Sequence, residues 1–164
     1  MEIRPARAED LPSILALYDA GRAYMRANGN QSQWGDGYPS ASLIQGDIAG
    51  GHCFLCVEEG IPVGVFCYFE GPDPTYRVIE DGAWLNDAPY GVLHRIAVAG
   101  HRRGVASAAF AFCLSRCKNL RVDTHEDNLP MQQALLKNGF VRCGIIHLLN
   151  GDPRVAFQKT EETL

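Results

Sequence analysis

The chain has 164 residues, of which 46% are hydrophobic and 21% are charged, an ordinary composition for a globular protein. The 15 Lys and Arg residues against 19 Asp and Glu residues give a net charge of -4, which argues against nucleic acid or an anionic membrane as the main partner. No apolar stretch approaches the ~20 residues of a membrane-spanning helix, and residues 1–10 lack the basic segment followed by an apolar run that is typical of a secretory signal. We therefore expect one cytoplasmic domain over residues 1–164.

The N-terminal half alternates between short strands and helices. Hydrophobic periodicity predicts a strand over 2–6, a helix over 9–28, a glycine-rich loop over 29–40 and a short helix over 41–50. Strands over 52–59 and 63–71 enclose a tight turn and therefore predict an antiparallel hairpin. Residues 72–89 contain three prolines and predict an irregular excursion.

The C-terminal half alternates more regularly. We expect a strand over 90–98, a helix over 105–117, a strand over 119–125, a helix over 128–139, and strands over 140–149 and 154–159. Asn128 suits the N-cap of its helix, and Gly139 follows the end of that helix. Hairpin strands followed by β-α-β-α-β predict an α/β (α+β) fold, in which a mixed sheet carries helices on both faces.

The six cysteines are interpreted as structural residues rather than as a metal site or a disulfide framework. Cys53 and Cys56 form a C-x-x-C motif, but residues three apart in a strand point to opposite faces. No second such motif completes a zinc site, so we expect no metal. Cys113 and Cys117 lie one turn apart on an apolar helix and are expected in the core.

The segment 99–104 joins an expected strand to the start of an expected helix. The first N–H groups of a helix lack intrahelical partners and lie at the positive end of the helix dipole, so such an end binds phosphate readily. Gly104 permits close approach of a ligand, Ala106 keeps the first turn free of bulk, and Arg102 and Arg103 add charge. A plain strand-helix turn with solvated arginines is the alternative.

Two common phosphate motifs are absent: the glycine spacing is one residue too short for a P-loop, and no G-x-G-x-x-G occurs. The sequence HRRGVA over 101–106 instead resembles the acetyl-coenzyme A loop of the GNAT superfamily of N-acetyltransferases, [Q/R]-x-x-G-x-[G/A], except that His101 occupies the first position. The sequence LHRIAV over 93–98 is similar to the fourth strand of that family. The helix and glycine of 128–140 resemble its N-x-x-A-x-x-x-Y-x-x-x-G-F segment.

The resemblance implies an acetyl-CoA site, with acetyl-CoA as the co-substrate. The pyrophosphate would rest on backbone N–H groups of Arg103, Gly104, Val105, Ala106 and Ser107. The pantetheine arm would run beside Ile96 and Val98 like an additional strand, and Asn128 would reach it from the next helix.

Two family residues that handle protons are missing. The family often has a tyrosine acid where this chain has Leu135, and many members have a glutamate where it has Val92. Strand alternation places His94 on the same face as Ile96 and Val98, which makes His94 the first candidate base. A structural histidine is the alternative. Glu70, at the end of the hairpin, is a second candidate base.

Two further clusters are candidates for the acceptor site. Trp34, Asp36 and Tyr38 lie in one loop and could form the wall of a pocket or fill a hydrophobic gap. Asp123 and His125 precede Asn128, together with two more acidic residues. This second cluster could hold a cationic acceptor, with His125 as a third candidate base, or organise the helix cap.

The resulting hypothesis is an N-acetyltransferase that transfers an acetyl group to a primary amine of a small molecule by direct attack in a ternary complex. A non-catalytic acyl-CoA sensor is the alternative, because of the missing tyrosine and glutamate. Acetylation of protein N-termini or lysines is a third reading, which the long loops disfavour because they suggest an enclosed pocket. We expect no nucleic-acid or membrane partner, and a homodimer is compatible with the sequence.

Overall fold

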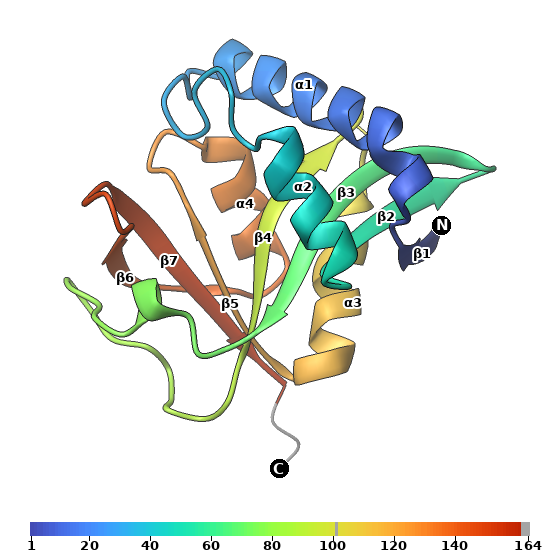
Figure 1. Ribbon diagram of the computed structural model, residues 1–164. Helices are drawn as coiled ribbons and strands as arrows, with labels where there is room; N and C mark the ends of the chain where they lie inside the picture. Colours follow the sequence, from blue (N-terminus) through green and yellow to red (C-terminus); the bar gives the residue numbers. More distant parts are fainter. Residues whose placement is uncertain (101, 162–164) are drawn as a thin grey trace.

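One mixed sheet of seven strands organises the chain, in the order β1-β2-β3-β4-β5-β7-β6 (Figure 1). The computed structural model describes residues 1–100 and 102–161. The strands are β1 (Glu2–Pro5), β2 (Cys53–Glu58), β3 (Ile61–Glu70), β4 (Gly91–Val98), β5 (Asn119–Thr124), β6 (Val141–His147) and β7 (Pro153–Thr160). The helices are α1 (Leu11–Ala27), α2 (Ala41–Ala49), α3 (Val105–Cys117) and α4 (Leu129–Lys137), with 3-10 turns at Ala8–Asp10 and Pro74–Tyr76. The predicted fold class is confirmed.

Local signals place the ends of the helices where the sequence indicates. The Ser40 hydroxyl accepts a hydrogen bond from Leu43 N at 3.2 Å and caps α2. Asn128 Oδ1 accepts from Met131 N at 3.2 Å and caps α4, and Gly139 follows with a φ of 84°. Such a left-handed residue is easiest for glycine, so α4 ends where expected.

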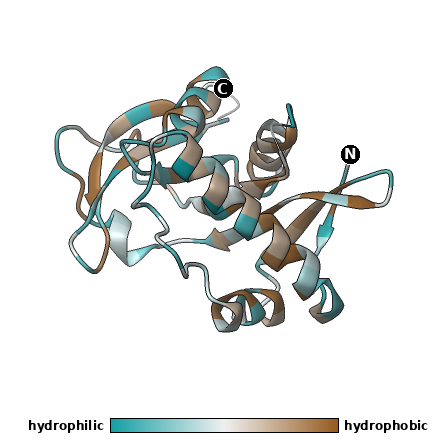
Figure 2. Ribbon diagram, turned by 90° about the horizontal axis from the view of Figure 1, so that it is seen from above, coloured by the Kyte–Doolittle hydropathy of each residue, from teal (hydrophilic) through white to brown (hydrophobic). Residues whose placement is uncertain are grey.

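Each face of the sheet carries its own hydrophobic core. α1 and α2 cover one face, where Ile14, Leu17 and Ile44 pack against strand residues such as Val65. α3 and α4 cover the other face with a larger cluster that includes Phe110. In Figure 2 many strand residues are hydrophobic, while the helices alternate between hydrophobic and hydrophilic residues, as amphipathic helices on a sheet do.

Five of the six cysteines belong to these two cores, and Cys143 is buried outside them. Cys53 lies in the cluster under α1 and α2, and Cys56 lies in the cluster under α3, so the C-x-x-C pair points to opposite faces as expected. Cys113 is fully buried, Cys117 is half-buried, and all six cysteines are free thiols. Burial raises the pKa of the Cys56 thiol to about 11, which keeps it protonated at neutral pH.

The sheet opens between β4 and β5. These two parallel strands pair only at Gly91 with Leu120 and at Val92 with Arg121. Beyond these pairs the strands separate, as Figure 1 shows from the lower to the upper part of the sheet. β4 remains paired to β3 up to Val98, so its other edge faces the opening from Leu93 onward.

An extra residue in β4 changes which way its side chains point. Cys67 pairs with His94 and Val65 pairs with Ala97, so three steps along β4 match two steps along β3. The bulge lies at Arg95, which has a left-handed φ of 53°. His94 and Ala97 therefore face α1 and α2, whereas Ile96 packs against the core under α3.

The expectation that His94 shares a face with Ile96 and Val98 is therefore wrong. Regular alternation predicts a common face for residues two apart, and the bulge breaks this alternation directly after His94.

In the described part of the chain, no helix has the length and apolar character that crossing a bilayer requires.

Candidate active site

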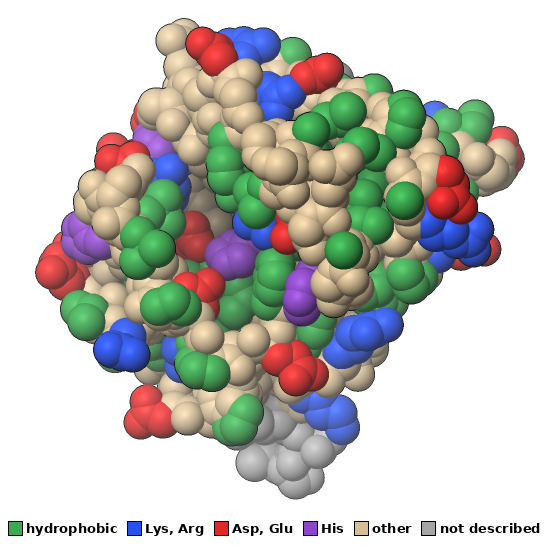
Figure 3. Space-filling view, viewed as in Figure 1, with side chains coloured by type: hydrophobic (Ala, Val, Ile, Leu, Met, Phe, Trp, Pro, Cys, Tyr) green, Lys and Arg blue, Asp and Glu red, His purple; other side chains and the backbone are tan. Residues whose placement is uncertain are grey.

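A cavity of about 1060 Å³ occupies the opening between β4 and β5. Figure 3 shows a hollow on this side of the molecule, with acidic, basic and histidine side chains inside it. Its volume is at the upper end of the range for small-molecule sites, so it has room for more than one ligand. One end lies at the N-terminus of α3, and the other lies between the 28–40 loop and the start of β7.

Two glycines shape the end at α3. A Cβ on Gly64 of β3 would lie 2.6 Å from Val105 Cγ1, so this glycine lets the first turn of α3 pack directly on the sheet. Gly104 precedes α3 with a φ of 85°, and a Cβ there would meet nothing within 4 Å. The backbone at Gly104 is therefore open to the cavity.

Unpaired backbone donors line this end. The first helical bond of α3 runs from Ala108 N to Gly104 O at 3.0 Å. The N–H groups of Val105, Ala106 and Ser107 precede it and so lack intrahelical partners. They combine with the positive end of the helix dipole and the small side chain of Ala106 into a cradle that suits an anion.

The two arginines of the loop differ. Arg102 Nη1 pairs with Glu58 Oε2 at 2.8 Å, so part of its charge is already neutralised. Arg103 is exposed, lines the cavity, and makes no ion pair among the described residues. Lys137, at the end of α4, adds a second cation to the lining. We therefore expect Arg103 rather than Arg102 to be the more available cation.

His94 and Asp73 form a hydrogen-bonded pair in the middle of the cavity. His94 Nε2 lies 3.0 Å from Asp73 Oδ2. Burial by itself raises the pKa of Asp73, but hydrogen bonds from His94 and Thr75 outweigh burial and lower this pKa to about 2. Asp73 is thus a carboxylate at neutral pH and accepts the Nε2 proton, which leaves Nδ1 of His94 as the basic nitrogen.

A second acidic side chain, Asp123, is hydrogen-bonded to a tyrosine that packs beside His94. Tyr76 OH donates to Asp123 Oδ2 at 2.6 Å, and Asp123 lines the cavity. Burial and the neighbouring Asp123 raise the pKa of Tyr76 well above its usual value, so the phenol stays protonated. Tyr76 also packs beside His94, with ring centroids 6.2 Å apart.

Arg95 holds the bulge that orients His94. Its Nε and Nη2 donate to both carboxylate oxygens of Asp47 at 2.9 Å, and its Nη1 donates to Tyr38 OH at 3.2 Å. Its own carbonyl accepts from Tyr18 OH at 2.8 Å. A left-handed non-glycine residue is costly by itself, and these bonds compensate for it.

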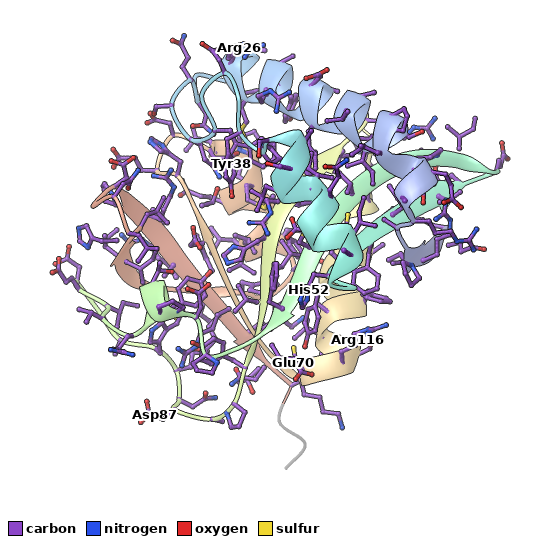
Figure 4. All side chains as sticks on the ribbon, viewed as in Figure 1. Arg26, Tyr38, His52, Glu70, Asp87 and Arg116 are labelled. Atoms are coloured by element: carbon purple, nitrogen blue, oxygen red, sulfur yellow. The ribbon has the colours of Figure 1, made fainter. Side chains whose placement is uncertain are left out.

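Aromatic side chains form the upper wall. Trp34 packs edge-on against Tyr18 at 5.6 Å between ring centroids and lies 6.3 Å from Tyr38. Trp34 both contacts the core under α1 and lines the cavity, so it combines the two alternatives considered for this loop. Figure 4 shows Tyr38 below α1 in the upper part of the view, well away from Glu70 at the lower end of β3.

Most of the candidate residues come together. The cavity is lined by Trp34, Tyr38, His94, Ile96, Val98, Arg102, Arg103, Gly104, Ala106, Ser107, Asp123 and Asn128. The lining does not include Asp36, Glu70, Val105 or His125. His101 lies outside the described residues.

The four that do not line it have other environments. Glu70 and Asp36 are exposed, and the side chain of Val105 is buried in the core, so only its backbone N–H remains a candidate. His125 Nδ1 accepts from Asp127 N at 3.0 Å, and its Nε2 lies 3.1 Å from Ser32 Oγ. His125 thus organises the turn before α4, which is the structural alternative for that cluster.

Asp73 and Arg154 line the cavity but were not among the candidates. Asp73 lies in the excursion of 72–89, where its carboxylate accepts from Thr75 N and Oγ1 at 2.9 and 2.7 Å. The Asp-Pro-Thr sequence signals this turn but not its contact with His94. Arg154 is the second residue of the last strand, and nothing near it in the sequence indicates a site. The described residues contain no group of three or more His, Cys, Asp or Glu side chains arranged to hold a metal ion.

Comparison with known proteins gives a consistent result. Residues 15–140 match the sequence model of the acetyltransferase (GNAT) family. An acetyltransferase structure of this family from Streptococcus agalactiae 2603 is 32% identical, with a TM-score of 0.87 over 99% of this chain and 96% of that chain. Another from Bacillus cereus ATCC 10987 is 25% identical, with a TM-score of 0.63 over 99% and 98%.

More distant structures share the fold alone. A chain of the NatC complex, solved with a Gag peptide and CoA, is 16% identical, with a TM-score of 0.64 over 99% of this chain and 100% of that chain. No curated protein matches the sequence.

Proposed function

The chain belongs to the GNAT family of acetyltransferases, and from this premise we propose that it transfers the acetyl group of acetyl-CoA to a primary amine of a small molecule. The observation that carries the proposal is the opening between β4 and β5, which connects an anion cradle at α3 with a His-Asp pair in one cavity. An acyltransfer site needs a group that binds the acyl donor and a group that accepts the proton of the amine, and the two must lie within reach of one another.

The residues at α3 fit coenzyme A. Open backbone at Gly104 and the unpaired N–H groups that follow it suit a pyrophosphate. The unpaired edge of β4 from Leu93 onward offers N–H and C=O groups to the amide-bearing arm, in the manner of strand addition. Asn128 lines the same wall, although its Oδ1 also caps α4.

The chemistry then rests on the His94 pair. Bound acetyl-CoA supplies an acetyl thioester, which an uncharged amine attacks at the carbonyl carbon. His94 Nδ1 accepts a proton from the acceptor ammonium, directly or through water, while Asp73 holds the ring by its Nε2 and stabilises the imidazolium. Backbone N–H groups on the free edge of β4 donate to the developing oxyanion.

The thiolate needs little help to leave. Leu135 occupies the position of the usual tyrosine acid and is fully buried. Its aliphatic side chain has no acidic proton to donate. A thiol with a pKa near 8.5 departs as a thiolate at neutral pH with modest assistance from water, whereas an ammonium near 10 is harder to deprotonate. The buried leucine is also the observation that favours the second candidate function, a non-catalytic acyl-CoA sensor.

An acetyl-CoA turnover screen tests the proposal. Amino acids, polyamines, aminoglycoside-type amines and peptides would each be incubated with acetyl-CoA, and release of free CoA thiol would be measured. We expect sustained, amine-dependent release with at least one small-molecule class. Stoichiometric binding of acetyl-CoA without turnover of any class would instead favour the sensor, and turnover of peptides alone would contradict the small-molecule acceptor.

A further inference from the structure

Arg154, the second residue of β7, places a buried guanidinium in the wall of the cavity. The residue is only 6% exposed and lines the end of the cavity opposite α3. Its Nη1 donates to Pro153 O at 2.9 Å and its Nη2 donates to Gln33 O at 3.3 Å. Both acceptors are backbone carbonyls, so neither supplies the negative charge that a buried cation calls for.

Two other arginines that are buried or half-buried have compensation that Arg154 lacks. Arg95 makes a two-pronged ion pair with Asp47. Arg121 lies over the rings of Trp84 and Tyr90, 4.1 and 3.9 Å from their centroids. For Arg154, the described residues provide no carboxylate within ion-pair distance and no aromatic ring beneath the guanidinium. A buried charge without a counter-ion is costly, and a bound anion would remove that cost.

The strand register places this cation on the same face as the His-Asp pair. Asp123 of β5 pairs with Ala156 of β7, and Arg154 lies two residues from Ala156 on the same face. Ala156 packs with Val92, two residues before His94, on the side of the sheet that His94 also faces. This side of the cavity thus carries the carboxylates of Asp73 and Asp123 near the expected position of the amine, and the guanidinium of Arg154 farther along.

We propose that Arg154 binds a carboxylate of the acceptor, and that the acceptor class is amine-bearing carboxylic acids such as amino acids. This inference rests on the proposed acetyl transfer and specifies its acceptor. The planar guanidinium fork matches the two oxygens of a carboxylate, while Asp73 and Asp123 favour the ammonium end of the same molecule. A neutral or purely cationic amine satisfies only the acidic part of this wall.

The test compares acceptors that differ only in charge. Each amino acid is assayed beside its carboxamide, which keeps the amine and the side chain, and beside an aminoalkyl phosphonate, which offers a different anion. We expect kcat/KM for the acid to exceed that for the carboxamide by about 10- to 100-fold, the effect of one charge-assisted hydrogen-bonded contact. Equal rates for acid and carboxamide would overturn the inference, as would a preference for the phosphonate over the acid.

Variants separate recognition from folding, because Arg154 also holds Gln33 O. Arg154→Gln should abolish the preference for the acid and leave the KM for acetyl-CoA unchanged, and Arg154→Lys should retain part of the preference. The matched control is Arg142→Gln on neighbouring β6, since Arg142 is exposed and outside the cavity lining. If both Arg154 variants lower the melting temperature but keep the acid-to-carboxamide ratio, the residue is structural and the inference is wrong.

Failure of the proposed function is distinguishable from failure of this inference. If no amine is acetylated, acetyl transfer is wrong, and the carboxylate site is tested by the melting temperature of the CoA-loaded protein with N-acetyl amino acids or their carboxamides. Stabilisation by the acids that disappears in Arg154→Gln would support the site. No difference between acids and carboxamides would overturn it.

Discussion

The two ends of the cavity are built in different ways. At α3, backbone N–H groups and small residues from 96–100 and 102–107 line the cavity beside residues of α4. At the other end, side chains from the 28–40 loop, the 71–90 loop, β5 and β7 line the cavity together with His94. The first end uses groups that every sequence possesses and needs only a local shape. The second depends on the identity of individual side chains and on the fold that gathers them.

Because of this difference, substitutions at the acceptor end should change kcat or the KM for the acceptor, whereas substitutions at α3 should change the KM for acetyl-CoA.

The largest effect is expected for His94→Ala. General-base assistance contributes about 10²–10⁴-fold, so kcat should fall by that range with little change in the KM for acetyl-CoA. His52 is the matched control, because its ring also packs against Phe69 but lies outside the cavity lining. A folded His94→Ala variant with the parental kcat would reduce His94 to a structural residue.

Gly104→Glu should act on the other end. The side chain adds bulk and negative charge at the open backbone position, and loss of charge-assisted contacts raises the KM for acetyl-CoA by about 10- to 100-fold. Gly51→Glu is the control, since Gly51 has a similar φ of 76° and equally open surroundings but lies outside the cavity lining. If isothermal titration shows equal CoA affinity for both variants, the cradle is misplaced.

Asp73→Asn should give an intermediate effect through His94. We expect kcat to fall about 10-fold, because the imidazole loses the group that orients it and stabilises its protonated form. The folded-state pKa of about 2 is lower than the usual 3.8, so the carboxylate contributes about 2 kcal/mol of stability above pH 4. That contribution is lost as the pH falls toward 2, and the stability difference between parent and variant should close there.

Asp10→Asn provides a control for this pair of effects. The hydrogen bond from Arg4 lowers the pKa of Asp10 to about 2 as well, at a position outside the cavity lining. Denaturant unfolding between pH 2 and pH 7 should therefore show, for both variants, a stability deficit relative to the parent protein that closes as the pH falls toward 2. A similar drop in kcat for Asp10→Asn would mean that the effect of Asp73 is one of stability alone.

The smallest effect is expected at the aromatic wall. Trp34→Ala should raise the KM for the acceptor by about 3- to 10-fold through lost apolar contact, with the KM for acetyl-CoA nearly unchanged. Trp84 packs on Tyr76 and Arg121 outside the cavity lining, so Trp84→Ala should affect stability but not the acceptor. The opposite pattern of KM values for Trp34→Ala would move the 28–40 loop to the cofactor end.

How much of each end of the cavity can be predicted from the sequence depends on whether that end is built from local or from distant residues. Hydrophobic periodicity, the cap at Asn128 and the glycine after α4 identify the elements within a few residues, because these signals are local. The strand-loop-helix around Gly104 is equally local, so the segment near α3 is visible in the sequence. The correct family follows from those same segments.

The remaining features depend on long-range contacts. The bulge at Arg95 is held by Asp47 and Tyr18 from distant helices, so no pattern within β4 announces it. Asp73 reaches His94 through a turn that looks like any Asx turn, and Arg154 reaches the cavity because β7 lies beside β5. Glu70 lies three residues beyond Cys67, the β3 partner of His94, at the end of β3 and outside the cavity lining.

The bulge in β4 also has a kinetic consequence. Because it turns His94 toward one face of the sheet while Ile96 and Val98 pack toward the other, two molecules can meet in the same opening without passing one another. An enzyme in which neither substrate obstructs the route of the other holds both at once before anything is released. Double-reciprocal plots at several fixed concentrations of the second substrate should therefore intersect, whereas a relay through an acetylated protein side chain would make them parallel.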